Sequence, residues 1–219
     1  MTKKELASYL DSTILANNAS YEDIEKLCLD AIKYNFKSVC VNPYFVRYAR
    51  ELLENTPVLV CTVIGFPLGM NTIETKIYET QNAIDDGADE IDMVINVSEL
   101  RNLNEEYCLN EINFIKQACG NLTLKVIVET SQLDEKQKEF AANLIKKSNA
   151  DFIKTSTGFI GDGAKIEDIQ KWSSILKGSK EIKASGGIRN LESCLAFIKT
   201  GADRIGTSKA LDIIASLDE

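Results

Sequence analysis

The sequence predicts a single-domain α/β fold of the (β/α)8 TIM-barrel class over residues 1–219. Short apolar runs alternate eight times with longer amphipathic segments, which is the pattern of strands followed by crossover helices. Some runs, such as residues 58–64, are apolar almost throughout, as expected for strands buried on both faces of a parallel sheet. Repeated right-handed crossovers can close such a sheet into a barrel. The competing open, doubly wound sheet usually carries a GxGxxG loop, which this sequence lacks.

The expected elements follow one another in order along the chain. Strands are expected at residues 9–14, 38–42, 58–64, 90–96, 123–129, 151–156, 181–185 and 204–207. Helices are expected at residues 20–35, 43–55, 71–86, 105–118, 134–148, 165–177, 190–200 and 208–217. Residues 9–14 also fit the end of a helix. The tripeptides GAD (87–89), NAD (149–151) and GAD (201–203) each lie between a helix and a strand, where Gly and Asn tolerate the left-handed conformation that ends a helix.

Composition narrows the class of protein. A hydrophobic fraction of 44% and a charged fraction of 26% are ordinary for a packed globular chain. The net charge of −8 argues against nucleic acid or an anionic membrane as the main partner. The first residues contain no apolar signal core, and no run approaches the roughly 20 apolar residues that span a bilayer. We therefore expect a cytoplasmic protein.

The chain contains no histidine and six cysteines. The absence of histidine excludes His-based triads, HExxH sites and most zinc sites, so no metal is expected. The cysteines are scattered, form no CxxC pair, and mostly suit small buried positions in a reducing compartment. Acid–base chemistry near neutral pH then falls to carboxylates, lysines or cysteines with shifted pKa values.

Ionisable residues occur inside four consecutive expected strands. Because side chains alternate between the two faces of a strand, Asp92, Lys125, Lys154 and Lys183 all face the barrel axis. Lysines can also extend toward solvent at strand ends or form structural ion pairs. Three of them beside a carboxylate are costly for stability alone and indicate a site that needs shifted pKa values.

This arrangement favours carbonyl chemistry. Two neighbouring ammonium groups disfavour double protonation, so one lysine becomes a neutral amine that can attack an aldehyde or ketone. The protonated imine that results withdraws electrons, so an adjacent carbon–carbon bond can break, while Asp92 moves protons directly or through water. The sequence therefore predicts a Schiff-base enzyme that needs no metal and no organic cofactor.

Two loops after the last strands suit an anion. Residues 185–189 (SGGIR) and 206–209 (GTSK) each precede a helix, where small residues let backbone N–H groups approach a phosphate. Barrels of this class usually bind phosphate after strands seven and eight. Gly158 is a candidate third edge, and Arg189 and Lys209 either add charge or are solvated helix-start residues.

With these residues in view, the sequence resembles the deoxyribose-phosphate aldolase family over nearly its whole length. Residues 151–158 (DFIKTSTG) resemble the Schiff-base segment of that family, 182–189 (IKASGGIR) its second-lysine segment, and 89–96 (DEIDMVIN) its aspartate segment. The resemblance implies that Lys154 is the nucleophile, that Lys183 keeps Lys154 partly neutral, and that Asp92 is the acid–base group. Lys125 matches a further lysine of the polar cluster. The implied reaction is reversible cleavage of 2-deoxy-D-ribose 5-phosphate to acetaldehyde and D-glyceraldehyde 3-phosphate.

The resemblance also implies a set of substrate contacts. These are Asp11, Thr13, Cys40, Gly158, Gly186, Gly187, Gly206 and Ser208. Cys40 is read either as a packing residue or as a thiol exposed to aldehyde in the pocket, and the resemblance favours the second. The expected partners are small sugar phosphates and aldehydes, with no nucleic acid and no membrane, and self-association as a homodimer or a homotetramer is left open.

Three positions depart from the family pattern. Ser12 replaces a histidine that many members carry, Lys209 follows Ser208, and Asp162 introduces a charge that we expect to point outward. Two alternatives remain from the sequence: another Schiff-base barrel aldolase or transaldolase, and a non-catalytic barrel that binds sugar phosphates.

Overall fold

The eight strands close into one parallel barrel, which confirms the predicted (β/α)8 class. The computed structural model describes residues 1–217. Neighbouring strands pair in chain order, and the ring closes where β1 pairs with β8. The strands are β1 (Leu10–Ile14), β2 (Ser38–Val41), β3 (Leu59–Ile64), β4 (Glu90–Val94), β5 (Thr123–Ile127), β6 (Phe152–Lys154), β7 (Glu181–Ser185) and β8 (Arg204–Thr207).

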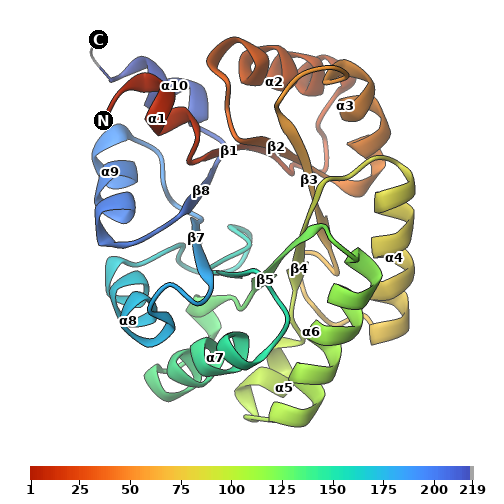
Figure 1. The fold of residues 1–219 in the computed structure, drawn as a ribbon, viewed down its shortest axis with the longest axis vertical. Helices are drawn as coiled ribbons and strands as arrows, with labels where there is room; N and C mark the ends of the chain where they lie inside the picture. Colours follow the sequence, from red (N-terminus) through yellow and green to blue (C-terminus); the bar gives the residue numbers. More distant parts are fainter. Residues whose placement is uncertain (218–219) are drawn as a thin grey trace.

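Helices surround the barrel as an outer layer (Figure 1). They are α1 (Lys3–Ala7), α2 (Tyr21–Tyr34), α3 (Val46–Leu52), α4 (Ile73–Asp85), α5 (Val97–Arg101), α6 (Glu105–Cys119), α7 (Glu135–Lys147), α8 (Ile166–Leu176), α9 (Leu191–Thr200) and α10 (Ala210–Ala215). Two 3-10 turns are added, η1 (Pro43–Phe45) and η2 (Thr130–Gln132). Among residues 1–217, no helix combines the length and the apolar character needed to cross a membrane.

Some helical segments differ from the sequence prediction. The helix expected at 43–55 is divided into η1 and α3, and α1 and α5 were not expected. α1 is short enough to escape a periodicity argument, but a capping box stabilises it, because Thr2 and Glu5 each accept the other's backbone N–H. α1 also packs against α10, and the two lie side by side in Figure 1.

The three Ala-Asp junctions share a hydrogen-bond pattern that the sequence argument did not foresee. In each, the aspartate backbone N–H donates to one residue of the preceding strand, and the carboxylate accepts the N–H of that same residue. The pairs are Asp89 with Val60, Asp151 with Leu124 and Asp203 with Ile182, at carboxylate distances of 2.8, 2.7 and 2.8 Å. Each aspartate thus fixes where its strand begins relative to the neighbouring strand.

The left-handed backbone conformation expected at these junctions is present at two of the three. Gly87 and Gly201 have φ values of 101° and 116°. The expectation for Asn149 is wrong, because α7 already ends at Ser148 in an extended conformation, with φ of −78° and ψ of 173°. The Ser148 hydroxyl then accepts the N–H of Ala150, so the turn closes without a left-handed residue.

Side-chain alternation divides the barrel into an apolar exterior and a charged interior. Ile91 and Met93 of β4 belong to the main core between the strands and the helices. Asp92, between them, is fully buried and turns toward the axis, where Lys125 also lies. The strand expected at residues 90–96 is shorter than predicted, because β4 ends at Val94 and the Asn96 side chain caps α5. The fold therefore gathers charged groups from several strands in one interior.

Candidate active site

Lys154 and Lys183 meet at a single carboxylate oxygen. Lys154 ends β6 and stands opposite Lys183 of β7 in the strand register. The Nζ atoms of both lysines donate to Oδ2 of Asp92 at 2.7 Å. Lys125 of β5 donates to the other oxygen, Oδ1, at 3.0 Å. The structure thus brings together the four side chains that alternation placed toward one interior.

Three further charged residues complete a closed ring beneath Lys154. Asp11 forms an ion pair with Lys183 at 2.6 Å and accepts from Arg204, whose guanidinium also donates to Glu90 at 2.7 Å. Glu90 in turn accepts from Lys125 at 2.7 Å. We call these six groups the charged ring. In order around it they are Arg204, Asp11, Lys183, Asp92, Lys125 and Glu90, so positive and negative groups alternate.

The pKa shifts of the anions favour their ionised forms. Burial alone would raise the pKa of Asp92, but the ammonium groups of Lys125, Lys154 and Lys183 hold it well below its usual range. Burial likewise opposes ionisation of Asp11 and Glu90, yet the neighbouring Arg204 and lysines lower the pKa of both.

The cations of the ring show the opposite shifts. Burial would lower the pKa of Lys183, but Asp11 and Asp92 hold it well above its usual range. Asp92, Cys61 and Glu90 raise the pKa of Lys125 in the same way. The ring is therefore balanced in charge, and the ammonium of Lys154, bound to Asp92 from outside the ring, is one surplus positive charge.

Glu90 and Arg204 are members of the ring that the sequence argument missed. Both begin their strands, and the alternation that places Asp92 inside also places Glu90 inside. The signal was present, but a charge at the first residue of an expected strand is easily assigned to the solvated strand end. Arg204 is buried, and its guanidinium also lies 6.0 Å from the centroid of the Phe152 ring.

A cavity of about 410 Å³ opens above Lys154. Lys154 is 4% exposed and is the member of the lysine and aspartate cluster that lines this cavity. The other lining residues are Thr13, Leu15, Ala16, Asn17, Thr157, Gly158, Phe159, Ser185, Gly186, Gly187, Ile188, Arg189, Gly206, Thr207 and Ser208. An entering molecule therefore meets the Lys154 amine before any other amine of the cluster.

The residues expected to hold an anion form one wall of this cavity. Gly158, Gly186, Gly187, Gly206 and Ser208 all line it. Gly186 and Gly187 have φ values of 86° and 77°, a left-handed conformation that side chains other than glycine rarely adopt. Backbone N–H groups in such a turn can converge on an anion. The wall thus offers a site for a phosphate.

The charged neighbours of this wall behave differently from one another. Arg189 lines the cavity, whereas the ammonium of Lys209 pairs with Asp212 at 3.2 Å on the surface. Asp162 is 81% exposed in its side chain and pairs with Lys165 at 3.4 Å, so it points outward as expected. One cationic side chain, that of Arg189, therefore adds to the small-residue wall.

Gly206 leaves room for Lys183. A Cβ atom built on Gly206 would lie 3.1 Å from Cε of Lys183 and 3.0 Å from Cβ of Ser185. Both distances are shorter than ordinary carbon–carbon contact. Glycine at this position leaves space on the inner side of β8 for the Lys183 side chain, which reaches Asp92.

Glu129 shapes another edge of the cavity. Its backbone is left-handed, with φ of 54° and ψ of 68°, which is uncommon for a residue other than glycine. Its Oε2 atom accepts from the Thr157 hydroxyl at 2.5 Å and from the Thr157 backbone N–H at 3.2 Å. The same hydroxyl accepts from the Phe159 N–H at 3.1 Å, so Glu129 fixes the turn that contains Gly158.

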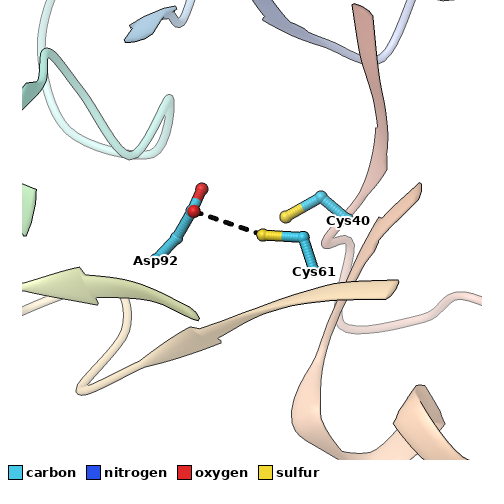
Figure 2. Close-up of side chains that lie close together, drawn as sticks. All are labelled: Cys40, Cys61 and Asp92. Atoms are coloured by element: carbon cyan, nitrogen blue, oxygen red, sulfur yellow. Dashed lines mark hydrogen bonds between the residues drawn. The ribbon is translucent and has the colours of Figure 1, made fainter. Parts of the chain in front are cut away.

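Cys40 lies beneath the cavity and not on its surface. Its side chain is fully buried beside Cys61, which corrects the expectation of a thiol exposed in the pocket. Figure 2 shows both thiols beside Asp92, to which Cys61 donates a hydrogen bond at 3.2 Å. Three potential ligand atoms from Cys40, Cys61 and Asp92 lie within 4.8 Å of one another. Three ammonium groups already bond Asp92, however, and their charge would repel a divalent cation.

The two predicted contacts on β1 have different positions. Thr13 lines the cavity. Asp11 is fully buried in the charged ring, where it pairs with Lys183 and Arg204. It does not line the cavity. Ser12, which replaces the family histidine, is also buried. The structure thus places Asp11 where it acts on Lys183.

Fold and site together define the class of this protein. The chain is a closed (β/α)8 barrel in which lysine amines surround an interior carboxylate, and one of these amines faces a cavity with a glycine-rich wall. This combination defines an aldolase barrel that works through an amine. Comparison with known proteins agrees. The model of the DeoC/LacD family aldolases matches residues 6–213, and the chain belongs to that family.

Individual relatives carry a more specific name. A deoxyribose-phosphate aldolase of Ureaplasma parvum is 62% identical over 206 residues, which cover 94% of this chain and 96% of the relative. The enzyme of that name from Caldicellulosiruptor saccharolyticus is 50% identical, over 98% of this chain and 99% of its own. The solved structure of the tetrameric deoxyribose phosphate aldolase of Aeropyrum pernix, 33% identical, superposes with a TM-score of 0.90 over 98% of this chain and 92% of its own.

Proposed function

We propose that this chain, as one catalytic domain over residues 1–219, cleaves 2-deoxy-D-ribose 5-phosphate reversibly to acetaldehyde and D-glyceraldehyde 3-phosphate through a Schiff base on Lys154. The observation that carries the proposal is the shared oxygen of Asp92, 2.7 Å from the amines of both Lys154 and Lys183. The choice of substrate rests on the relatives named deoxyribose-phosphate aldolase, which match the chain over nearly its whole length.

The charge balance of the site explains why Lys154 is the nucleophile. Lys183 bonds two carboxylates, those of Asp11 and Asp92, whereas Lys154 bonds Asp92 alone. Loss of a proton from Lys183 would unbalance the charged ring, while loss of a proton from Lys154 leaves the whole cluster neutral. Lys183 therefore stays a cation and Lys154 supplies the neutral amine, which also faces the cavity.

The reaction then follows from the chemistry of the amine. Neutral Lys154 adds to the C1 carbonyl of the open-chain sugar, and loss of water gives a protonated imine. A base takes the proton of the C3 hydroxyl, the C2–C3 bond breaks, and its electron pair moves toward the imine nitrogen to form an enamine. D-Glyceraldehyde 3-phosphate leaves. Protonation of the enamine at C2 and addition of water then release acetaldehyde and restore the amine.

Asp92 is suited to relay the protons of these steps through water, with Lys125 beside it. In the resting enzyme three ammonium groups hold the pKa of Asp92 well below its usual range, against the effect of burial. While Lys154 is the neutral amine, before the protonated imine restores a positive charge at its nitrogen, one of those three groups carries no charge and the carboxylate is a stronger base for the proton transfers of amine addition. Proton acceptance by Asp92 is thereby linked to the presence of the reactive amine.

The phosphate of the substrate is assigned to the wall built from Gly158, Gly186, Gly187, Gly206 and Ser208. Arg189 adds a positive charge at the same wall. In this arrangement the sugar aldehyde points down toward Lys154, because the wall and the amine lie on one cavity.

Trapping of the imine tests the proposal. Borohydride reduction in the presence of acetaldehyde should add an ethyl group to one lysine, which peptide mass analysis should identify as Lys154. The Lys154→Leu variant should show neither label nor cleavage. A label confined to another lysine, or cleavage that survives in Lys154→Leu, would overturn the assignment.

A donor panel separates this reaction from the other Schiff-base barrel enzymes. Acetaldehyde should serve as the donor for condensation with D-glyceraldehyde 3-phosphate, and dihydroxyacetone phosphate should not. Turnover with dihydroxyacetone phosphate would indicate a ketose-bisphosphate aldolase, and transfer of a larger keto unit would indicate a transaldolase. Binding of the sugar phosphate without turnover would indicate a non-catalytic barrel.

The remaining proposals concern assembly and location. The structure of the Aeropyrum pernix relative is described as tetrameric, so we propose that this chain also self-associates, as a homodimer or a homotetramer. Light scattering during size-exclusion chromatography gives the mass that decides between them. With an overall charge of −8, we further propose a cytoplasmic protein that does not act on nucleic acid.

A further inference from the structure

Two buried residues of the charged ring, Glu90 and Arg204, have no assigned part in the reaction. Neither lines the cavity described above. Arg204 lies between Asp11 and Glu90, and Glu90 lies between Arg204 and Lys125. Each is separated from Lys154 by two or more intervening charged groups, so any effect on Lys154 is exerted through the ring and through the electric field.

The charges of the interior give Arg204 a specific effect. With Arg204 present, the six ring groups are balanced, and the ammonium of Lys154 is the surplus charge. Without Arg204, three carboxylates would face Lys125, Lys183 and Lys154, and a protonated Lys154 would then be fully balanced. Removal of Arg204 therefore takes one positive charge out of the field that acts on the Lys154 amine.

Glu90 has the opposite effect. Removal of its charge would leave four cations facing Asp11 and Asp92 alone, so the field at the Lys154 amine would become more positive. Burial makes these effects large, because Glu90 and Arg204 are 3% and 4% exposed and solvent screens charges poorly at such positions. One strand, β5, lies between Glu90 of β4 and Lys154 of β6.

We propose that Glu90 and Arg204 are positioning residues that act through the charged ring to set the pH above which Lys154 becomes a nucleophile. This inference rests on the proposed Schiff-base function of Lys154. Every strand of the barrel contributes to the field at that amine. The titratable and charged groups concerned are Asp11 of β1, Cys40 of β2, Cys61 of β3, Glu90 and Asp92 of β4, Lys125 of β5, Lys183 of β7, Arg204 of β8, and Glu129 after β5.

The alternative is that the two residues only stabilise the barrel. A structural role predicts that their replacement lowers the amount of folded enzyme or its rate at every pH. The proposed role predicts shifts of opposite sign along the pH axis, because one residue is an anion and the other a cation. Opposite shifts cannot arise from a common loss of stability.

The experiment compares pH–rate profiles for cleavage of deoxyribose 5-phosphate, measured as kcat/KM, in purified full-length variants. Glu90→Gln should move the acidic midpoint of the profile to lower pH, and Arg204→Gln should move it to higher pH, each by about one pH unit. The double variant should lie between the two singles, near the wild type. Glu90→Asp, which keeps the charge, should also remain near the wild type.

A matched control lies outside the barrel interior. Glu111 is a fully buried carboxylate that pairs with Lys76 at 2.5 Å between α6 and α4. Glu111→Gln removes the same charge from an equally buried pair, and its acidic midpoint should stay at the wild-type value. A shift like that of Glu90→Gln would mean that any buried charge has this effect, which would overturn the inference.

The outcomes distinguish this inference from the proposed function. If wild-type Lys154 is not labelled by borohydride and acetaldehyde, the proposed function fails. If Lys154 is labelled but Glu90→Gln and Arg204→Gln leave the midpoint unchanged, or move it in the same direction, only the present inference fails. If Arg204→Gln does not fold, the acidic midpoints of Glu90→Gln, Glu90→Asp and Glu111→Gln decide. The inference then requires a shift to lower pH in Glu90→Gln and in neither of the other two variants.

Discussion

Lys154 and Lys183 stand directly opposite each other in the register of β6 and β7. Their amines meet at one oxygen of Asp92, at 2.7 Å each. Adjacent strands alone would bring two ammonium groups into repulsion, and the shared carboxylate makes their proximity stable. The reactivity of Lys154 therefore depends on its partner across the strand pair as much as on its own surroundings.

Replacement of Lys183 by Leu should remove most of the activity while the fold is retained. The positive charge that disfavours a proton on Lys154 is lost, so kcat/KM at neutral pH should fall by roughly 100-fold or more, and the acidic midpoint of the pH–rate profile should move to higher pH. The rate of imine trapping by borohydride at several pH values provides an independent measurement.

The surface variant Lys147→Leu is the control for that substitution. Lys147 pairs with Glu105 at 2.8 Å on the exposed face of the outer helices, outside the barrel interior. Its activity and pH profile should match those of the wild type. An active Lys183→Leu enzyme with an unchanged profile would show that Lys183 does not govern the amine of Lys154.

Replacement of Arg189 by Gln should weaken binding of the phosphate end alone. A charge-assisted contact contributes on the order of 1.5–3 kcal/mol, so KM for deoxyribose 5-phosphate should rise about tenfold or more. The kinetics of unphosphorylated 2-deoxyribose should be unaffected. Lys209→Gln is the matched control, because Lys209 pairs with Asp212 on the surface, and its KM should remain at the wild-type value. Equal losses for both sugars would place Arg189 elsewhere in the mechanism.

Acid should destabilise the protein through the anions of the charged ring. Neighbouring cations lower the pKa of Asp11, Glu90 and Asp92 in the folded state, against the effect of burial. Their contribution to stability is therefore complete above the unfolded pKa of about 4 and is lost as the pH falls through the lower folded values. The urea concentration at half unfolding should fall between about pH 5 and pH 2.

The Glu90→Gln variant tests the origin of that acid sensitivity. One of the three depressed carboxyls is then absent, so the decrease in the unfolding midpoint with falling pH should be less steep than in the wild type. Glu105→Gln, which alters a partly exposed surface pair, should retain the wild-type slope. Identical slopes in all three proteins would assign the acid sensitivity to carboxyls outside the ring.

Chelation should leave cleavage unchanged. The Cys40, Cys61 and Asp92 cluster contains potential ligand atoms, but the ammonium groups around Asp92 oppose a divalent cation. Activity after dialysis against EDTA should equal that of the untreated enzyme, and added zinc or cadmium should not increase it. Loss of activity on dialysis that a metal restores would contradict the amine mechanism.

The alternation of side chains made much of this site predictable. The inward direction of Asp92, Lys125, Lys154 and Lys183 follows from the period of two along a strand, which depends on local geometry alone. The anion wall followed from small residues at two known positions of the barrel. The same alternation places Glu90 inside the barrel, but a charged first residue of a strand is also typical of a solvated strand end.

Other features depend on the folded molecule. The pairing of Arg204 with Asp11 joins residues at opposite ends of the chain, and only closure of β1 on β8 brings them together. Burial of Cys40 depends on packing inside the barrel, which residue type alone does not settle. The left-handed backbone of Glu129 could not be predicted either, because that conformation is rare for residues other than glycine.

The charge balance of the ring also separates substrate recognition from amine chemistry, which take place at two ends of the cavity. When Lys154 is the neutral nucleophile, Lys154 and the charged ring together carry no excess positive charge that could attract a dianionic sugar phosphate. Recognition of the sugar phosphate must then come from the glycine-rich wall and Arg189, at the other end. Affinity and reactivity are thus set by separate parts of the molecule, so acceptor preference can be altered at the wall while the amine chemistry below is conserved.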